Sequence, residues 1–146
     1  KQSYVIDFKE YPVLPKNDKV FLCVGSNEKN KNIRLLEMIA LEVVKKRNRI
    51  FIFIGLKECN FESKHDKFIF INNIHDAYLS FLYEKVDYFI ITSTAEGLSF
   101  PVADAVDHGT IVLALKLPVF YDLYNNNDKV ILFDTEKNFL DYISIL

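Results

Sequence analysis

The chain has no tryptophan and only two cysteines, four glycines and four prolines among its 146 residues. Two cysteines without a CxxC spacing or a nearby histidine cluster exclude a disulfide framework and predict that no metal is bound. So little glycine and proline excludes collagen-like and low-complexity chains. The 18 basic and 20 acidic residues nearly cancel, leaving a net charge of −2. No dominant basic field is therefore available, and we expect no nucleic-acid partner.

Long apolar runs are also missing. None approaches the roughly 18 residues that a membrane-spanning helix needs, and the first residues lead into no apolar signal segment. Half of the chain is hydrophobic, which is enough for one core at this length. We therefore expect a cytoplasmic protein with no membrane span, folded as one domain.

Short continuous runs of β-branched and aromatic residues recur along the sequence. They are Val20–Val24, Ile50–Ile54, Phe68–Ile71, Val86–Ile91, Ile111–Leu115 and Val130–Phe133. Runs without alternation are typical of parallel strands that are buried on both faces. Helical patterns separate most of them, over 33–44, His75–Glu84, Phe100–His108, Val119–Tyr124 and Phe139–Ile145. This order predicts an α/β fold with a doubly wound, mainly parallel sheet sandwiched by helices.

The first 18 residues are less regular than the rest. Within them, Tyr4–Phe8 is either an edge strand or part of a linker. We expect residues 1–18 to be linker or edge strand and residues 19–146 to form the Rossmann-like domain. Ligands of such folds bind at the carboxyl ends of the strands, so the residues after each apolar run are the candidate site.

The first candidate segment runs from Gly25 to Asn32, where a glycine ends a strand and a helix opens. A helix N-terminus binds anions through its free N–H groups and its dipole, and Lys31 adds a full positive charge for a phosphate. The segment is neither a P-loop nor a GxGxxG turn. The alternative is a solvated lysine in an asparagine-rich loop, with Asn32 as the helix cap.

The second candidate segment follows the fourth apolar run. Glu96 lies in the turn, Gly97 allows a tight backbone, and the amides of Leu98 and Ser99 come at the start of a helix. With Asp104 eight residues after Glu96, the segment suits a ligand that carries both phosphate and sugar hydroxyls. Two alternatives remain. Glu96 caps the helix while Asp104 lies on its exposed face, or the two acids form a hydrolase pair.

Residues 96–105, EGLSFPVADA, followed by Gly109 and Thr110, resemble the E-G-F-G-L-P-x-x-E-A signature of family-4 glycosyltransferases with the GT-B fold. Three further segments are similar to that family. They are the glycine and lysine of 24–36, the LYxxVDxF run of 82–89 and the PVFxD run of 118–122. Order and spacing agree over roughly residues 19–124.

The resemblance implies the C-terminal, donor-binding half of an enzyme that takes a nucleotide-sugar, such as a UDP- or GDP-sugar, and transfers its hexose with retention. The implied partner is an N-terminal acceptor-binding domain, absent from this chain, and no metal cofactor is implied. Without that domain, the half alone is expected to be nearly inactive. The implied catalytic residues are Lys31, on the donor pyrophosphate, and Glu96, facing the transferred sugar. The implied substrate-binding residues are Gly25, Ser26 and Gly97, with Ile74 at the base, Leu98 and Ser99 at a phosphate, and Asp104 at the ribose.

The chain departs from the family pattern at several of these positions. Ser26 stands where the family has arginine, which removes one of two cations expected on the pyrophosphate. Asp104 replaces glutamate and Ser99 replaces glycine, and the second glycine usual after the second strand is missing at Leu56-Lys57. These changes favour a second hypothesis, in which the domain is a non-catalytic nucleotide-binding or interaction module of the same fold.

Overall fold

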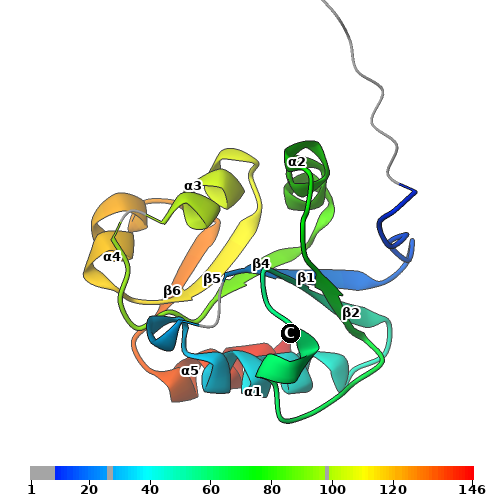
Figure 1. The fold of residues 1–146 in the computed structure, drawn as a ribbon. Coiled ribbons are helices and arrows are strands. Elements are labelled where there is room, and N and C mark those ends of the chain that lie inside the picture. Colours follow the sequence, from blue (N-terminus) through cyan, green and yellow to red (C-terminus); the bar gives the residue numbers. More distant parts are fainter. Residues whose placement is uncertain (1–8, 26–27, 98) are drawn as a thin grey trace, which may run out of the picture.

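A computed structural model describes residues 9–25, 28–97 and 99–146 (Figure 1). Its centre is a six-stranded sheet of order β3-β2-β1-β4-β5-β6, in which all the strand pairs are parallel. The strands are β1 (Lys19–Val24), β2 (Arg49–Ile54), β3 (Phe68–Ile71), β4 (Tyr88–Ile91), β5 (Ile111–Leu115) and β6 (Val130–Phe133). The predicted doubly wound α/β fold is confirmed.

Helices cover both faces of the sheet (Figure 1). One face carries α2 (Asp76–Lys85), α3 (Phe100–Asp107) and α4 (Pro118–Tyr124), and the other carries α1 (Ile33–Val44) and α5 (Glu136–Ile145). Two single-turn 3-10 helices, η1 (Lys29–Lys31) and η2 (Glu58–Asn60), follow β1 and β2. No helix among the described residues is long and apolar enough to cross a membrane.

The two faces of the sheet belong to two separate hydrophobic clusters, as β2 illustrates. Ile50, Ile52 and Ile54 belong to the cluster on the face that α2, α3 and α4 cover, whereas Phe51 and Phe53 belong to the cluster on the face of α1 and α5. Successive side chains of a strand point to opposite faces, and helices on both sides bury them all. This double burial is why β2 reads as a continuous apolar run in the sequence.

Two element boundaries differ from the sequence-based prediction by two residues or more. β4 begins at Tyr88 instead of Val86, because the Val86 amide still bonds to α2 and ends that helix. α5 begins at Glu136 instead of Phe139, because the Thr135 side chain accepts a hydrogen bond from a first-turn amide and caps the helix there.

The described part of the N-terminal segment packs against the domain. Over residues 9–18 the chain forms turns and no strand. The ring of Tyr11 stacks on Tyr78 of α2 at 4.1 Å between centroids, and its hydroxyl accepts a hydrogen bond from His75 N (2.8 Å). Tyr4–Phe8 lies outside the described residues, and the domain boundary at residue 18 stays a prediction.

Candidate functional site

The loop from β1 to α1 brings Lys31 to the carboxyl edge of the sheet. Gly25 directly follows β1 and its N–H donates to Ile54 O (3.0 Å), and Lys31 is the last residue of η1. Asn32 then takes a left-handed conformation (φ 55°), and its side chain accepts from Leu35 N (3.4 Å) to cap α1. The predicted asparagine cap is therefore confirmed, and it turns the chain from η1 directly into the helix.

The loop from β4 to α3 carries the second set of predicted residues. Ser99 is buried, and its hydroxyl caps α3 by accepting from Val102 N (3.4 Å). The hypothesis that Glu96 is the cap is therefore wrong, and its carboxylate is available for another contact. Gly97 is exposed, whereas Leu98 lies outside the described residues.

The two predicted catalytic side chains meet. Lys31 Nζ donates to Glu96 Oε2 at 2.8 Å, and the two side chains are 25% and 8% exposed. A charge-assisted bond of this length, largely shielded from water, is stronger than an exposed surface pair. Lys31 is thus no freely solvated surface lysine, because an anionic partner 65 residues away holds its ammonium group.

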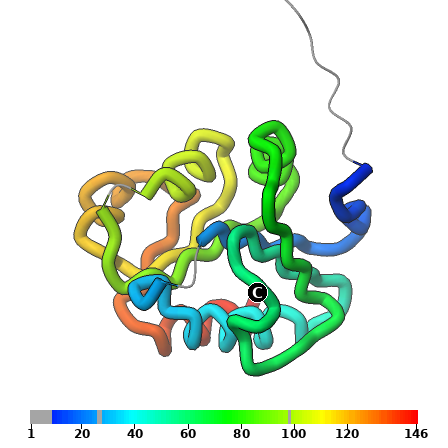
Figure 2. The backbone as a smooth tube through the Cα atoms, in the orientation of Figure 1, coloured from blue at the N-terminus to red at the C-terminus, as the bar shows by residue number. Residues whose placement is uncertain are grey.

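The main chains of the same two loops are joined by further hydrogen bonds that the sequence analysis missed. Thr92 Oγ1 donates to Lys31 O (2.8 Å) and to Asn32 O (3.2 Å), and Thr94 N donates to Asn30 O (2.8 Å). The Asn30 side-chain amide in turn donates a hydrogen bond to Ala95 O (3.0 Å). Figure 2 shows η1, in light blue, against the lime-green segment after β4. The available signal was a run of hydroxyl residues, Thr-Ser-Thr, directly after a buried apolar strand.

A small cavity lies beneath this junction. It has a volume of about 10 Å³, and Gly25, Lys31, Cys23 and Ser93 are among the residues that line it. Ser93 is buried, and its hydroxyl has no hydrogen-bond partner among the described residues. Burial also raises the pKa of the Cys23 thiol to about 12, so it stays protonated and unreactive at neutral pH.

Glycine is required where the loops after β1 and β2 touch. Gly55 has a positive φ of 83°, and a Cβ added there would lie 2.2 Å from Gly25 O. By contrast, a Cβ added at Gly25 or Gly97 would meet no described atom within 4 Å. The carboxyl edge beside Lys31 therefore depends on Gly55, the glycine that directly follows β2.

The remaining predicted site residues lie apart from the Lys31–Glu96 contact or outside the described residues. The Asp104 side chain is exposed on α3, and within the described part of the chain no hydrogen bond or ion pair joins its carboxylate to Lys31 or Glu96. Ile74, in the loop before α2, packs partly buried against the cluster on that face. Ser26 falls outside the described residues. Among those that are described, no three His, Cys, Asp or Glu side chains are grouped to hold a metal ion.

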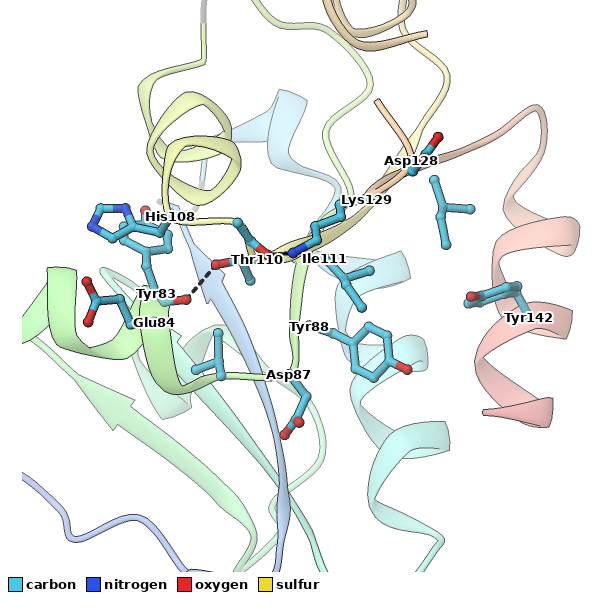
Figure 3. A pocket seen from close by; sticks show the side chains of 13 residues that line it. Tyr83, Glu84, Asp87, Tyr88, His108, Thr110, Ile111, Asp128, Lys129 and Tyr142 are labelled. Carbon is cyan, nitrogen blue, oxygen red and sulfur yellow. Dashed lines mark hydrogen bonds between the residues drawn. The ribbon is translucent and has the colours of Figure 1, made fainter. Parts of the chain in front are cut away.

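A separate pocket of about 380 Å³ opens at the opposite edge, near the amino ends of β4, β5 and β6 (Figure 3). Two polar groups at this edge are used in structural bonds. Thr110 Oγ1 donates to Tyr83 O (2.5 Å), and Lys129 Nζ donates to Gly109 O (3.0 Å). Ligands of open α/β sheets bind at the carboxyl ends of the strands. The loops that hold Lys31 and Glu96 are therefore the candidate site.

Several solved structures that the fold resembles are glycosyltransferases. WaaG, a glycosyltransferase of lipopolysaccharide biosynthesis, matches with a TM-score of 0.74 and 16% identity, over 90% of this chain and 38% of its own. The C-terminal domain of the group 1 glycosyltransferase LpcC from Francisella tularensis matches with a TM-score of 0.67 and 17% identity, over 93% and 84%. The pneumococcal O-GlcNAc transferase GtfA, solved with UDP and GlcNAc, matches with a TM-score of 0.65 and 16% identity, over 89% and 29%. The chain thus spans less than half of GtfA and of WaaG.

No curated protein sequence matches the chain. A protein family does, over residues 6–145, and its description is Glycosyl transferases group 1. That match covers nearly the whole chain and agrees with the parallel sheet and its helices. The chain belongs to the group 1 glycosyltransferase family.

Proposed function

We propose that this chain is the donor-binding domain of a retaining glycosyltransferase. It binds a nucleotide-sugar, and the enzyme transfers the hexose to an acceptor held by an N-terminal domain. The observation that carries the proposal is the 2.8 Å contact between Lys31 and Glu96, which joins the loops after β1 and β4. A cation and a carboxylate at one point of the carboxyl edge suit a ligand that has a diphosphate next to a sugar.

Each proposed role follows from the charge of the group. Lys31 binds the pyrophosphate and stabilises the negative charge that develops as the bond from the anomeric carbon to the diphosphate breaks. Main-chain amides of Gly97, Leu98 and Ser99 bind a phosphate at the start of α3. Glu96 accepts hydrogen bonds from hydroxyls of the hexose, and the charge on the leaving group is neutralised without a metal.

The rest of the nucleotide lies along the same edge in this proposal. Asp104 on α3 accepts hydrogen bonds from the ribose hydroxyls, and Ile74, in the loop after β3, contacts the base. Gly25 and Ser26 line the phosphate subsite. The free thiols of Cys23 and Cys59 suit a reducing compartment, and we propose that the enzyme is cytoplasmic.

Ligand titration tests the proposal directly. We expect millimolar UDP, GDP or ADP, or one of their sugars, to shift amide resonances of the loops after β1 and β4. The pocket at the opposite edge supplies the internal control, because resonances of Thr110 and Lys129 are expected to stay in place. A panel in which no ligand shifts either loop would contradict the proposal.

A second candidate function is the non-catalytic module, which Ser26 favours because it stands where the family has a cation. The variant Ser26→Arg separates the two. If the loop follows the family path, the restored cation beside Lys31 strengthens diphosphate binding by about 1 kcal/mol, or about fivefold, after screening by solvent. Equal or weaker affinity in calorimetry would show that the loop is not built for a pyrophosphate.

A further inference from the structure

Thr92, the first residue after β4, has an unusual set of contacts for a buried side chain. It is 2% exposed, and its hydroxyl donates to two successive main-chain carbonyls, Lys31 O at 2.8 Å and Asn32 O at 3.2 Å. Asn32 O also accepts the first main-chain bond of α1, from Leu36 N (3.1 Å). The hydroxyl therefore ties the end of η1 and the start of α1 to the strand beneath them.

The residue before Lys31 is held to the same segment. Asn30 O accepts from Thr94 N (2.8 Å), and the Asn30 side chain donates to Ala95 O (3.0 Å). The main chain before, at and after Lys31 is thus bonded to residues 92–95. Glu96, which takes the Lys31 ammonium group, is the next residue of that segment.

This arrangement bears on how a flexible lysine can serve as a fixed cation. A lysine side chain has several rotatable bonds and loses rotamer entropy when its ammonium group is held at one point. Electrostatic stabilisation of a developing charge requires that the cation be in place before the reaction. Because the main chain at Lys31 is anchored, only the rotatable bonds of its side chain still have to be restricted when the ammonium group binds an anion.

We propose that Thr92 is a positioning residue for Lys31: its buried hydroxyl fixes the main chain at Lys31 and so directs the ammonium group toward the donor diphosphate. This inference rests on the proposed function, in which Lys31 binds that diphosphate. Thr92 itself touches no ligand in it. Valine has the same shape as threonine and would fill the same buried space, so the hydroxyl, and not the volume of the side chain, carries the role.

A double-mutant cycle tests the proposal through the affinity for the nucleoside diphosphate that the wild-type domain binds best among UDP, GDP and ADP. The chains compared are wild type, Thr92→Val, Lys31→Met and the double variant. We expect Thr92→Val to weaken binding about fivefold, the scale of one net hydrogen bond, and Thr92→Ser, which keeps the hydroxyl, to restore most of the affinity. In the Lys31→Met background, Thr92→Val should have almost no effect, because the side chain that it positions is gone.

A purely structural role predicts a different cycle. If Thr92 only supports the loop, its substitution weakens binding by the same factor with and without the Lys31 ammonium group, and that additivity would overturn the proposal. Should Thr92→Val fail to fold, Asn30→Ala replaces it in the double-mutant cycle, because it removes the side-chain hydrogen bond to Ala95 O at the exposed side of the same junction. It should likewise weaken diphosphate binding in the wild-type background and have almost no effect in the Lys31→Met background. A wild-type domain that binds no member of the panel contradicts the proposed function. Binding with an additive cycle contradicts the positioning role alone.

Discussion

Replacing Glu96 by glutamine removes one charge and little volume from the contact with Lys31. In the free protein, Lys31 Nζ lies 2.8 Å from Glu96 Oε2, and the carboxylate side chain is 8% exposed. A diphosphate has to attract the ammonium group away from this partner. Charge-assisted hydrogen bonds are roughly twice as strong as neutral ones, so the amide of Glu96→Gln holds the lysine less tightly. We expect the variant to bind a bare diphosphate about 1 kcal/mol, or about fivefold, more tightly.

The sugar form of the same nucleotide should respond in the opposite sense. There the carboxylate accepts hydrogen bonds from the hexose, and their loss costs about 1.5–3 kcal/mol, more than the release of Lys31 restores. The net expectation for Glu96→Gln is weaker binding of the nucleotide-sugar. Asp104→Asn should weaken both ligands by the same factor, because both carry the ribose.

Calorimetric affinities of both variants for both ligands give the assay. Asp141→Asn is the control, because it weakens in the same way a Lys137–Asp141 contact of the same 2.8 Å length on the exposed side of α5. It should leave both affinities unchanged. Equal losses for the two ligands in Glu96→Gln would refute the assigned roles, even in a domain that binds nucleotides.

Three further predictions concern the scaffold. Gly55→Ala should lower the free energy of unfolding by at least about 2 kcal/mol, because φ is +83° and the new Cβ would lie 2.2 Å from a carbonyl oxygen. In Gly25→Ala the new Cβ meets no described atom within 4 Å, so this control should lose less stability. Urea titration measures both values. In the native protein at about pH 8, iodoacetamide should modify exposed Cys59 and spare Cys23, whose pKa burial raises to about 12, and intact mass reads the difference. A hydrogen bond from the guanidinium of Arg34 in α1 holds the pKa of the Glu136 carboxyl below its usual 4.5. This contribution to stability is present above that value and lost as the pH falls through the lowered pKa, so Glu136→Gln should flatten the acid limb of the unfolding free energy.

Much of the fold could be predicted because strands that are buried on both faces give a recognisable pattern in the sequence. Strands covered on both faces cannot alternate, so runs such as that of β2 stood out, and their spacing left room for a helix after most of them. Helix-capping rules also predicted the start of α1 and the end of α3. Asn32 caps α1, and Gly109 follows α3 with a positive φ of 74°. The errors at β4 and α5 arose where apolar periodicity and capping disagree. Val86 is apolar, as a strand residue would be, but it ends the helix α2. Thr135 caps α5, so that helix begins before the first residue of its apolar face.

The site could be predicted less fully than the fold. Topology alone suggested that Lys31 and Glu96 lie near each other, since both follow strands at one edge. That Glu96 binds Lys31, and that Thr92 bonds to its carbonyl, depends on contacts between residues more than 60 positions apart. No local pattern encodes such a contact, because it is set by how closely two loops pack once the sheet has formed. The roles of Lys31, Glu96, Ile74 and Asp104 toward a donor stay predictions.

The meeting of these loops follows from the strand order. β1 and β4 are neighbours in the sheet, yet the helices that follow them lie on opposite faces, α1 on one and α3 on the other. The chain therefore leaves the two strands in opposite directions, and the carboxyl edge between them is a topological switch point, where open α/β sheets bind their ligands. β3, whose loop carries Ile74, lies two strands from β1, or about 10 Å at the usual spacing of about 4.8 Å. Under the proposed function, a base near Ile74 and a diphosphate at Lys31 would bind at the ends of strands separated by a distance that a ribose and its phosphates can span, so that one extended nucleotide could reach both loops.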